Sequence, residues 1–156
     1  MAFVVKKFGG SSVATPEKIY HLVDRVLAER KPDDKIVIVV SAMGDTTDDL
    51  LTLAGRITDH MPKREMDMLL ATGEQISIAL LASAFMERGQ KAVSFTGFQA
   101  GIRTNGSFTK ASILEVKAER VKKALDEGNI VIVAGFQGIT DEGDITTLGR
   151  GGSDTT

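Results

Sequence analysis

Four stretches of the sequence place glycine, hydroxyl and charged residues together in patterns suited to binding an anion. They are Lys7-Phe8-Gly9-Gly10-Ser11-Ser12, Ser41-Ala42-Met43-Gly44-Asp45-Thr46-Thr47, Thr96-Gly97-Phe98-Gln99-Ala100-Gly101-Ile102, and Gly149-Arg150-Gly151-Gly152-Ser153-Asp154. Adjacent glycines let backbone N–H groups converge on an anion, and a following helix N-terminus adds partial positive charge. Several such loops meeting at one place predict a polyanionic ligand.

Five charged or hydroxyl side chains in or near these loops are candidate functional groups, and each has a plainer alternative. Lys7, at the end of an apolar run, could bind phosphate as a point charge or extend past the sheet edge into water. Arg150, between glycines, could bind a substrate carboxylate with its two parallel N–H donors or remain a solvated loop cation. Glu74 in a first helical turn, and Ser153 and Asp154 as helix caps, would be favourable without any catalytic role.

The common signatures of other enzyme classes are absent from the sequence. There is no Gly-Lys dipeptide of a Walker loop, no GxGxxG, no HExxH and no GxSxG, and no cysteine is present. His21 and His60 are isolated, so we interpret both as non-catalytic. From spacing alone, the sequence favours an anion-binding α/β enzyme of none of the commonest nucleotide-binding classes.

Apolar runs alternate with helical patterns along the chain. The predicted strands cover residues 3–8, 35–42, 91–97 and 129–135. The predicted helices begin at Thr15 (N-cap) with Pro16, and cover 47–60, 63–71, 74–88 and 118–127. Thr72 and Gln75 have capping-box spacing, which predicts a separate helix start at that point.

This alternation predicts an α/β fold, in which a mostly parallel sheet is covered by helices on both faces. The ligand crevice of such a sheet lies beyond the carboxyl ends of its strands, where the polar motifs fall. A Gly-containing turn predicts a late hairpin within residues 136–148.

Composition is that of one compact soluble domain. The chain has 156 residues, 42% hydrophobic and 26% charged, with a formal net charge of -2. We therefore expect neither nucleic acid nor a membrane as a partner. Binding to nucleic acid or to an anionic membrane surface needs a basic surface, and spanning a bilayer needs a longer apolar segment. The absence of cysteine and of a targeting segment favours the cytoplasm.

Six motifs taken in order carry a resemblance to a known family. KFGGSSV, VVSAMGDTTDDL, TGEQIS, SFTGFQAGI, VAGFQG and TTLGRGGSDTT together resemble the aspartate kinase branch of the amino acid kinase family, and they span nearly the whole chain. The resemblance implies a three-layer α/β/α sandwich of the amino acid kinase (carbamate kinase-like) type. It also implies transfer of a phosphoryl group from ATP, with Mg2+, to the side-chain carboxylate of L-aspartate, which gives 4-phospho-L-aspartate for lysine, threonine and methionine biosynthesis.

The same resemblance assigns roles to individual residues. Lys7, Phe8, Gly9, Gly10 and Ser41 would contact ATP phosphates, and Asp154 would orient Lys7 and the reacting groups, which makes Lys7 and Asp154 the catalytic pair. The aspartate-binding residues would be Thr47, Glu74, Arg150, Gly151, Gly152 and Ser153. Mg2+ is expected to arrive with ATP, and we assign no residue of this chain as a metal ligand.

Length is the main departure from the family pattern. The GRGGSDTT motif lies at the end of the sequence, so we expect residues 1–156 to be the N-terminal part of the catalytic domain, without the nucleoside-binding half and the regulatory ACT domains. A homo-oligomer is expected of the full-length enzyme. Two alternatives stay open: a kinase of the same family for another acceptor, and a non-catalytic chain that folds, self-associates or binds aspartate weakly.

Overall fold

A four-stranded parallel sheet organises the molecule. The computed structural model of the chain describes residues 1–149 and 156. Its larger sheet has the order β1 (Phe3–Phe8), β2 (Lys35–Val40), β6 (Ile130–Ala134), β3 (Ala92–Phe95). All neighbouring pairs are parallel, so the carboxyl ends of the four strands lie at one edge, as predicted.

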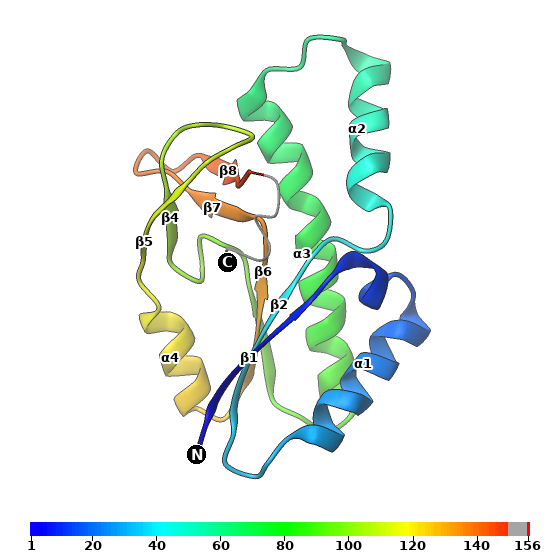
Figure 1. Ribbon diagram of the computed structural model, residues 1–156, viewed down its shortest axis with the longest axis vertical. Helices are drawn as coiled ribbons and strands as arrows, with labels where there is room; N and C mark the ends of the chain where they lie inside the picture. The colour runs from blue at the N-terminus through cyan, green and yellow to red at the C-terminus, as the bar shows by residue number, and fades with distance from the viewer. Residues whose placement is uncertain (150–155) are drawn as a thin grey trace.

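Helices cover the two faces of this sheet and give three layers (Figure 1). The helices α1 (Pro16–Glu29) and α3 (Lys63–Glu87) lie on one face, and α4 (Glu119–Asp126) lies on the other. Successive strand residues point to opposite faces, so each face has its own core. The predicted α/β/α sandwich with a mostly parallel sheet is confirmed.

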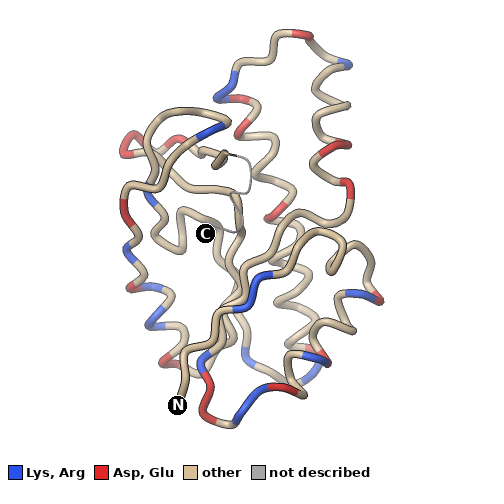
Figure 2. Tube along the Cα trace, in the orientation of Figure 1, with Lys and Arg blue, Asp and Glu red and all other residues tan. Residues whose placement is uncertain are grey.

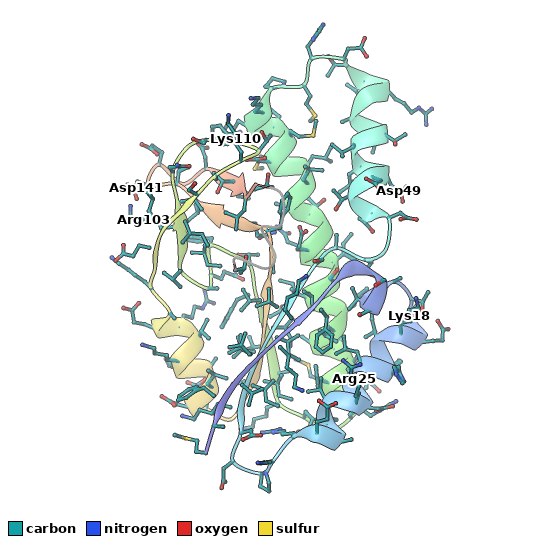
Figure 3. All side chains as sticks on the ribbon, in the orientation of Figure 1. Lys18, Arg25, Asp49, Arg103, Lys110 and Asp141 are labelled. Atoms are coloured by element: carbon teal, nitrogen blue, oxygen red, sulfur yellow. The ribbon has the colours of Figure 1, made fainter. Side chains whose placement is uncertain are left out.

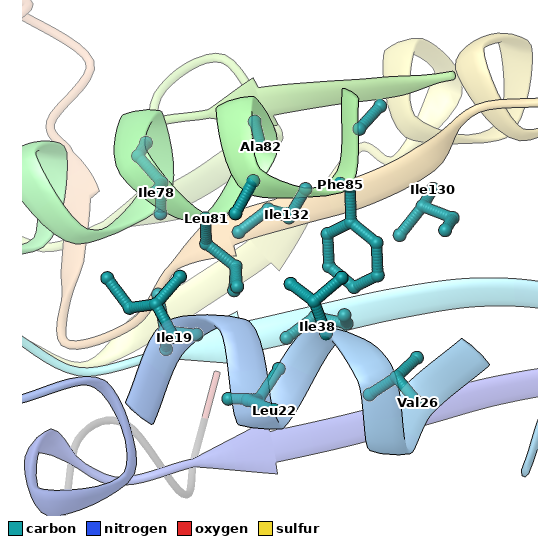
Figure 4. Close-up of a cluster of buried hydrophobic side chains, with 14 of the residues drawn as sticks. Ile19, Leu22, Val26, Ile38, Ile78, Leu81, Ala82, Phe85, Ile130 and Ile132 are labelled. Atoms are coloured by element: carbon teal, nitrogen blue, oxygen red, sulfur yellow. The ribbon is translucent and has the colours of Figure 1, made fainter. Parts of the chain in front are cut away.

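The core on the α1 and α3 side is the larger of the two. Ile38 and Ile132 of the central strands are fully buried against Leu81 and Phe85 of α3, and α1 adds Leu22 (Figure 4). On the opposite face, α4 packs against the alternate residues of the same strands, including Val39, Val131 and Val133. Burial of these branched side chains fixes the register of the strands and therefore the position of the loops that follow them.

The helix α1 begins where the sequence predicts. The Oγ1 of Thr15 accepts a hydrogen bond from the backbone N–H of Lys18 at 3.2 Å, and Pro16 is the first helical residue. The next helix, α2 (Thr46–Ile57), lies beside α3 and ends three residues before the predicted boundary. Only Ala54 of α2 is buried. Among the helices in the described part of the chain, α2 is therefore the most exposed to solvent.

The prediction of two helices over residues 63–71 and 74–88 is wrong, because α3 is continuous. Thr72 does not cap a helix; its Oγ1 donates to the carbonyl oxygen of Leu69 at 2.7 Å within the helix. Gly73 is also helical and lies against Ala42, where a larger residue has no room. A long buried face on α3 overrides the local capping pattern.

A second, smaller sheet adjoins the first, in the order β5 (Ile113–Val116), β4 (Ile102–Thr104), β7 (Gln137–Ile139), β8 (Ile145–Thr147). The predicted hairpin is confirmed: β7 and β8 are antiparallel, and Gly143 in their turn has a φ of 89°. The strands β4 and β5 were not predicted. Three or four residues are too few to show a two-residue periodicity.

One face of β1 departs from the expectation that helices cover the whole sheet. Phe3 is 64% exposed and Val5 is 69% exposed, and Lys7 on the same face is exposed as well. Lys7 thus lies on a side of β1 that no described element covers, although the predicted fold has helices on both faces of the sheet.

The helix α3 is long and apolar enough to be a candidate membrane span by length and composition. In the fold, 56% of its 18-residue apolar window is buried, and it packs along the sheet as a core helix.

Basic and acidic residues are interspersed along the described chain (Figure 2).

Candidate functional site

The glycine loop after β1 is held by the loop after β2. The N–H of Gly44 donates to the carbonyl oxygen of Gly10 at 2.9 Å, and the N–H of Ser41 donates to that of Phe8 at 3.2 Å. A Cβ atom on Gly10 would lie 2.5 Å from the carbonyl oxygen of Ala42, so only glycine fits this approach. The two loops predicted to bind phosphate therefore meet at the carboxyl edge of the sheet.

Lys7 lies at this same edge, next to β2. The parallel register pairs Lys7 with Val39 and Phe8 with Val40, directly before Ser41. Four of the residues predicted to contact phosphate, Lys7, Gly9, Gly10 and Ser41, thus come from two neighbouring strand ends. Phe8, the fifth, is buried in the core with an exposed fraction of 8%, so only its backbone is suited to that role.

Thr47 lies in the first turn of α2, beyond the loop of β2. The turn is closed by Thr46, whose Oγ1 donates to the carbonyl oxygen of Met43 at 2.5 Å, while Thr47 is half-buried. The same short segment, residues 41–47, therefore carries both a predicted phosphate contact and a predicted aspartate contact.

Glu74 is a buried carboxylate in the middle of α3, and not in a first turn as predicted. Its exposed fraction is 3%. Burial raises the pKa of the Glu74 carboxyl from 4.5 to about 7, against the opposing effect of its own backbone, the backbone of Ala42 and the side chain of Gln137. No described residue donates a hydrogen bond to its Oε2 atom.

An unpartnered buried carboxylate oxygen is costly, so a carboxylate in this position is suited to receiving a cationic or N–H donor group. The plainer alternative, that a carboxylate is favourable in a first helical turn whatever its function, does not apply to Glu74 because it lies in the interior of α3. The residue next to it, Gly73, lies against Ala42, because a Cβ atom on Gly73 would be 2.9 Å from the Cβ of Ala42. Ala42 thus joins the glycine loop to the part of α3 that carries Glu74.

Gln137, at the start of β7, is a site residue that the sequence analysis missed. Its Nε2 donates to the carbonyl oxygen of Ala71 at 3.1 Å, and its Oε1 accepts from the N–H of Gly97 at 3.2 Å. Gln137 is 3% exposed and also lowers the pKa of Glu74. The motif VAGFQG contains it, and a polar residue three positions after the end of the fully apolar strand β6 was the available signal.

Phe136, the neighbour of Gln137, is one of two described non-glycine residues with a positive φ, at 70°. Its N–H donates to the Oγ1 of Thr156 at 3.3 Å. Such a backbone conformation is strained for a residue with a Cβ atom, and strain of this kind gathers at functional sites. The junction of β6 and β7 therefore belongs to the candidate site.

The remaining predicted residues cannot be placed. Arg150, Gly151, Gly152, Ser153 and Asp154 lie outside the described residues. The chain reaches this segment from β8, which pairs with β7. Thr147, the last residue of β8, lies opposite Gln137 of β7.

A separate cavity of about 230 Å³ lies on the α1 side of β1. Its lining includes Ser12, Lys18, His21 and Arg25, of which Lys18 and Arg25 project from α1 (Figure 3). Lys7 points to the opposite face of β1, because alternate strand residues face opposite sides. Phe8 and Ser11 of the glycine-loop segment also line this cavity, whereas Thr47 and Glu74 do not, so the cavity borders the loop without including Glu74.

The fold and the site define a parallel α/β protein whose candidate ligand-binding groups gather at the carboxyl ends of its strands. A model of the amino acid kinase family matches residues 2–156, and the chain belongs to that family. The resemblance carried by the six motifs is confirmed.

Curated relatives and solved structures agree with this membership. The chain is 57% identical to the aspartokinase of Bacillus sp. (strain MGA3) and 58% identical to that of Geobacillus stearothermophilus, with all of this chain and 38% of each relative covered. An aspartate kinase structure from Synechocystis matches 97% of this chain and 25% of its own, at 49% identity and a TM-score of 0.81. E. coli aspartokinase III in complex with aspartate and ADP covers 97% of this chain and 44% of its own, at 26% identity and a TM-score of 0.82.

Proposed function

We propose that this chain forms the aspartate-binding part of a kinase that transfers a phosphoryl group from ATP to the side-chain carboxylate of L-aspartate, giving 4-phospho-L-aspartate. The observation that carries the proposal is Glu74, a buried carboxylate with an oxygen to which no described residue donates. The α-ammonium group of an amino acid would satisfy that oxygen and hold Glu74 in its charged form. The aspartate and ADP bound to E. coli aspartokinase III support the same ligand pair.

Thr47 and Glu74 are the proposed contacts to aspartate among the described residues. We assign the same role to Arg150, Gly151, Gly152 and Ser153, with Arg150 binding the α-carboxylate. Two parallel N–H donors on a guanidinium suit a carboxylate better than a lysine does.

Lys7, the amides of Phe8, Gly9 and Gly10, and Ser41 are the proposed contacts to ATP phosphates. The aspartate side chain is already ionised at neutral pH, so the reaction needs no general base. The difficulty is the approach of two anions, which repel by roughly 4 kcal/mol at about 4 Å and an effective dielectric near 20. Lys7 and the loop amides would offset this repulsion, and Asp154 would hold Lys7 in place.

Mg2+ would enter with ATP and add charge neutralisation at the phosphates. Within the described residues, no three histidine, cysteine or carboxylate side chains converge as a metal site would require. We propose that the phosphates of the nucleotide hold this metal.

The chain spans 38% of the length of the curated relatives it matches. We accordingly propose that residues 1–156 correspond to the N-terminal part of a longer catalytic domain, in a cytoplasmic enzyme of lysine, threonine and methionine biosynthesis that acts as a homo-oligomer. Neither nucleic acid nor a membrane is a proposed partner.

A second candidate is that the 156-residue chain alone binds aspartate without turning over ATP. The exposed face of β1, with Phe3 64% and Val5 69% exposed, favours it, because apolar side chains of this size on a strand are suited to packing against further protein. ATP turnover by the isolated chain would contradict this candidate.

Calorimetric titration of the chain with L-aspartate, with and without Mg-ATP, tests the proposal. We expect binding that Glu74→Gln abolishes and that Glu87→Gln, an exposed carboxylate at the end of α3, leaves unchanged. Parallel titration with L-glutamate tests the alternative acceptor. Tighter binding of glutamate than of aspartate would overturn the assignment of the substrate.

A further inference from the structure

Asp67 is a buried carboxylate whose hydrogen bonds all lead away from its own helix. It lies in the first half of α3 with an exposed fraction of 0%. Its oxygens accept from the N–H of Thr109 at 2.9 and 3.1 Å, from the N–H of Thr147 at 2.9 Å, and from the Oγ1 of Thr147 at 2.7 Å. One side chain thus ties three separate segments together.

The groups that Asp67 holds are not placed by local structure alone. Thr109 is the other described non-glycine residue with a positive φ, at 69°, a conformation that needs support from its surroundings. Thr147 is the last residue of β8, two residues before Gly149, and its carbonyl oxygen accepts from the N–H of Ala111 at 3.0 Å. Asp67 therefore fixes both the loop before β5 and the end of β8.

Asp67 and Glu74 share one face of α3. They are seven residues apart, which is about two helical turns and a rise of roughly 10 Å. Both are buried: Asp67 contacts Thr147 of β8, and Glu74 lies near the side chain of Gln137 of β7, so both face the second sheet. The helix therefore carries the attachment point of β8 and the candidate aspartate ligand on the same rigid element.

The two positions are also connected through the hairpin. In the β7–β8 pair, Thr147 lies opposite Gln137. Gln137 returns to α3 through its hydrogen bond to the carbonyl oxygen of Ala71, next to Glu74. Hydrogen bonds and strand pairing thus connect Asp67 to Thr147, Thr147 to Gln137, and Gln137 back to α3.

We propose that Asp67 is a positioning residue for the substrate site: it sets the β7–β8 hairpin on α3 so that the side chain of Gln137 lies near the carboxylate of Glu74. The inference rests on the proposed function, and it adds a residue to which no role in aspartate binding has been assigned above. The four contacts explain why a carboxylate is needed. An asparagine has one acceptor oxygen, and its NH2 group would face a backbone N–H donor.

The test compares Asp67→Asn with Asp144→Asn in the same chain. Asp144 lies in the β7–β8 turn and accepts from Arg64 of α3 at 2.9 Å, so it is a second, solvent-exposed link between the same two elements. Thr147→Val is the milder variant, because it removes only the hydroxyl donor to Asp67. Circular dichroism shows whether each variant folds. If Asp67→Asn does not fold, Thr147→Val tests the positioning role in its place.

Three measurements are made on each variant. The titration of Glu74 is followed through its 13C-labelled carboxyl by NMR, the exchange of the Thr109 and Thr147 amides is followed with deuterium, and aspartate affinity is measured by calorimetry. In Asp67→Asn we expect the pKa of Glu74 to move from about 7 toward 4.5 as water reaches it. We expect both amides to exchange about tenfold faster and the aspartate Kd to rise about tenfold, as for loss of a hydrogen bond to a charged group. Thr147→Val should show smaller changes in the same direction, and Asp144→Asn should show none.

A purely structural role would give a different result. If Asp67→Asn and Thr147→Val accelerate amide exchange while the titration of Glu74 and the aspartate Kd stay at their wild-type values, the positioning role is overturned. If the unmodified chain does not bind aspartate, the proposed function of this chain fails by that measurement. The titration of Glu74 then still decides whether Asp67 positions the site.

Discussion

The carbonyl oxygen of Ala42 lies 2.5 Å from the point where a Cβ atom on Gly10 would stand. The Cβ atom of Ala42 lies 2.9 Å from the point where a Cβ atom on Gly73 would stand. Ala42 is therefore enclosed by the glycine loop on one side and by α3 on the other. This packing brings the predicted phosphate-binding loop and the predicted aspartate ligand Glu74 into one site.

Gly10→Ala should weaken the site and the fold, because the new methyl group must push the loop away from Ala42. We expect a loss of about 1–3 kcal/mol in the free energy of unfolding, typical of overpacking against a rigid neighbour. Gly9→Ala is the matched control, since nothing lies within 4 Å of a Cβ atom there and its φ is -77°. Urea unfolding of both variants measures the difference. Equal stabilities would show that the loop adapts freely and that Gly10 is not required for the approach.

Gly73→Ala offers a second comparison, in which helix propensity and packing oppose each other. Alanine in place of glycine inside a helix is worth up to about 1 kcal/mol, and Gly55→Ala in α2, with nothing within 4 Å, should show that gain. At Gly73 the contact with Ala42 should outweigh it and give a net loss of stability together with weaker aspartate binding. Thermal unfolding of the pair is the measurement. A gain of stability in both variants would contradict the tight contact.

The parallel sheet and its three layers could be predicted because long apolar runs and helical periodicity are local signals. The four strands of the larger sheet, the cap at Thr15 and the β7–β8 hairpin all follow from such signals. The division of α3 at Thr72 was wrong because the buried face of a helix 25 residues long outweighs a capping pattern. The strands β4 and β5 were too short to be recognised.

Thr47 and Glu74 lie on helices, so the sequence predicts their place in the candidate site only through the family resemblance. The other described candidates could be predicted because a motif ends a strand. Lys7, Gly9, Gly10 and Ser41 were found in this way, and the structure brings them together. Gln137 and Asp67 were missed because their importance depends on partners 66 and 80 residues away in the sequence, Ala71 and Thr147. Gln137 has one local signal, a polar side chain shortly after the apolar strand β6, whereas the sequence around Asp67 has none.

Lys7 and Glu74 should affect different kinetic constants in the longer kinase proposed above. Lys7→Ala should lower kcat by about 100-fold or more with little change in the aspartate KM, because the lysine acts on charge that develops in the transition state. Glu74→Ala should raise the aspartate KM by about 30-fold or more, as for loss of a bond to a charged group. Lys6→Ala is the control, since Lys6 points to the α1 side and pairs with Glu29. Steady-state kinetics with varied aspartate separates the two effects. An unchanged kcat in Lys7→Ala would refute this division of roles.

Glu74 should also make the stability of the chain depend on pH in a predictable direction. Its pKa is raised from 4.5 to about 7 in the folded protein, so the folded state binds the proton more tightly than the unfolded state does. The stabilising effect of this proton is complete below pH 4.5 and is lost as the pH rises through 7, at a cost of about 3 kcal/mol.

Glu74→Gln cannot titrate and should avoid that loss. We expect the variant and the unmodified chain to have similar unfolding free energies near pH 4, and the variant to be more stable by up to about 3 kcal/mol at pH 8. Urea unfolding at several pH values measures the difference, with Glu87→Gln as the exposed control that should follow the unmodified chain. Curves that run parallel from pH 4 to 8 would mean that the carboxylate is not desolvated. A gain of stability at pH 8 accompanied by loss of aspartate binding would instead identify Glu74 as a group whose burial serves the ligand at the expense of the fold.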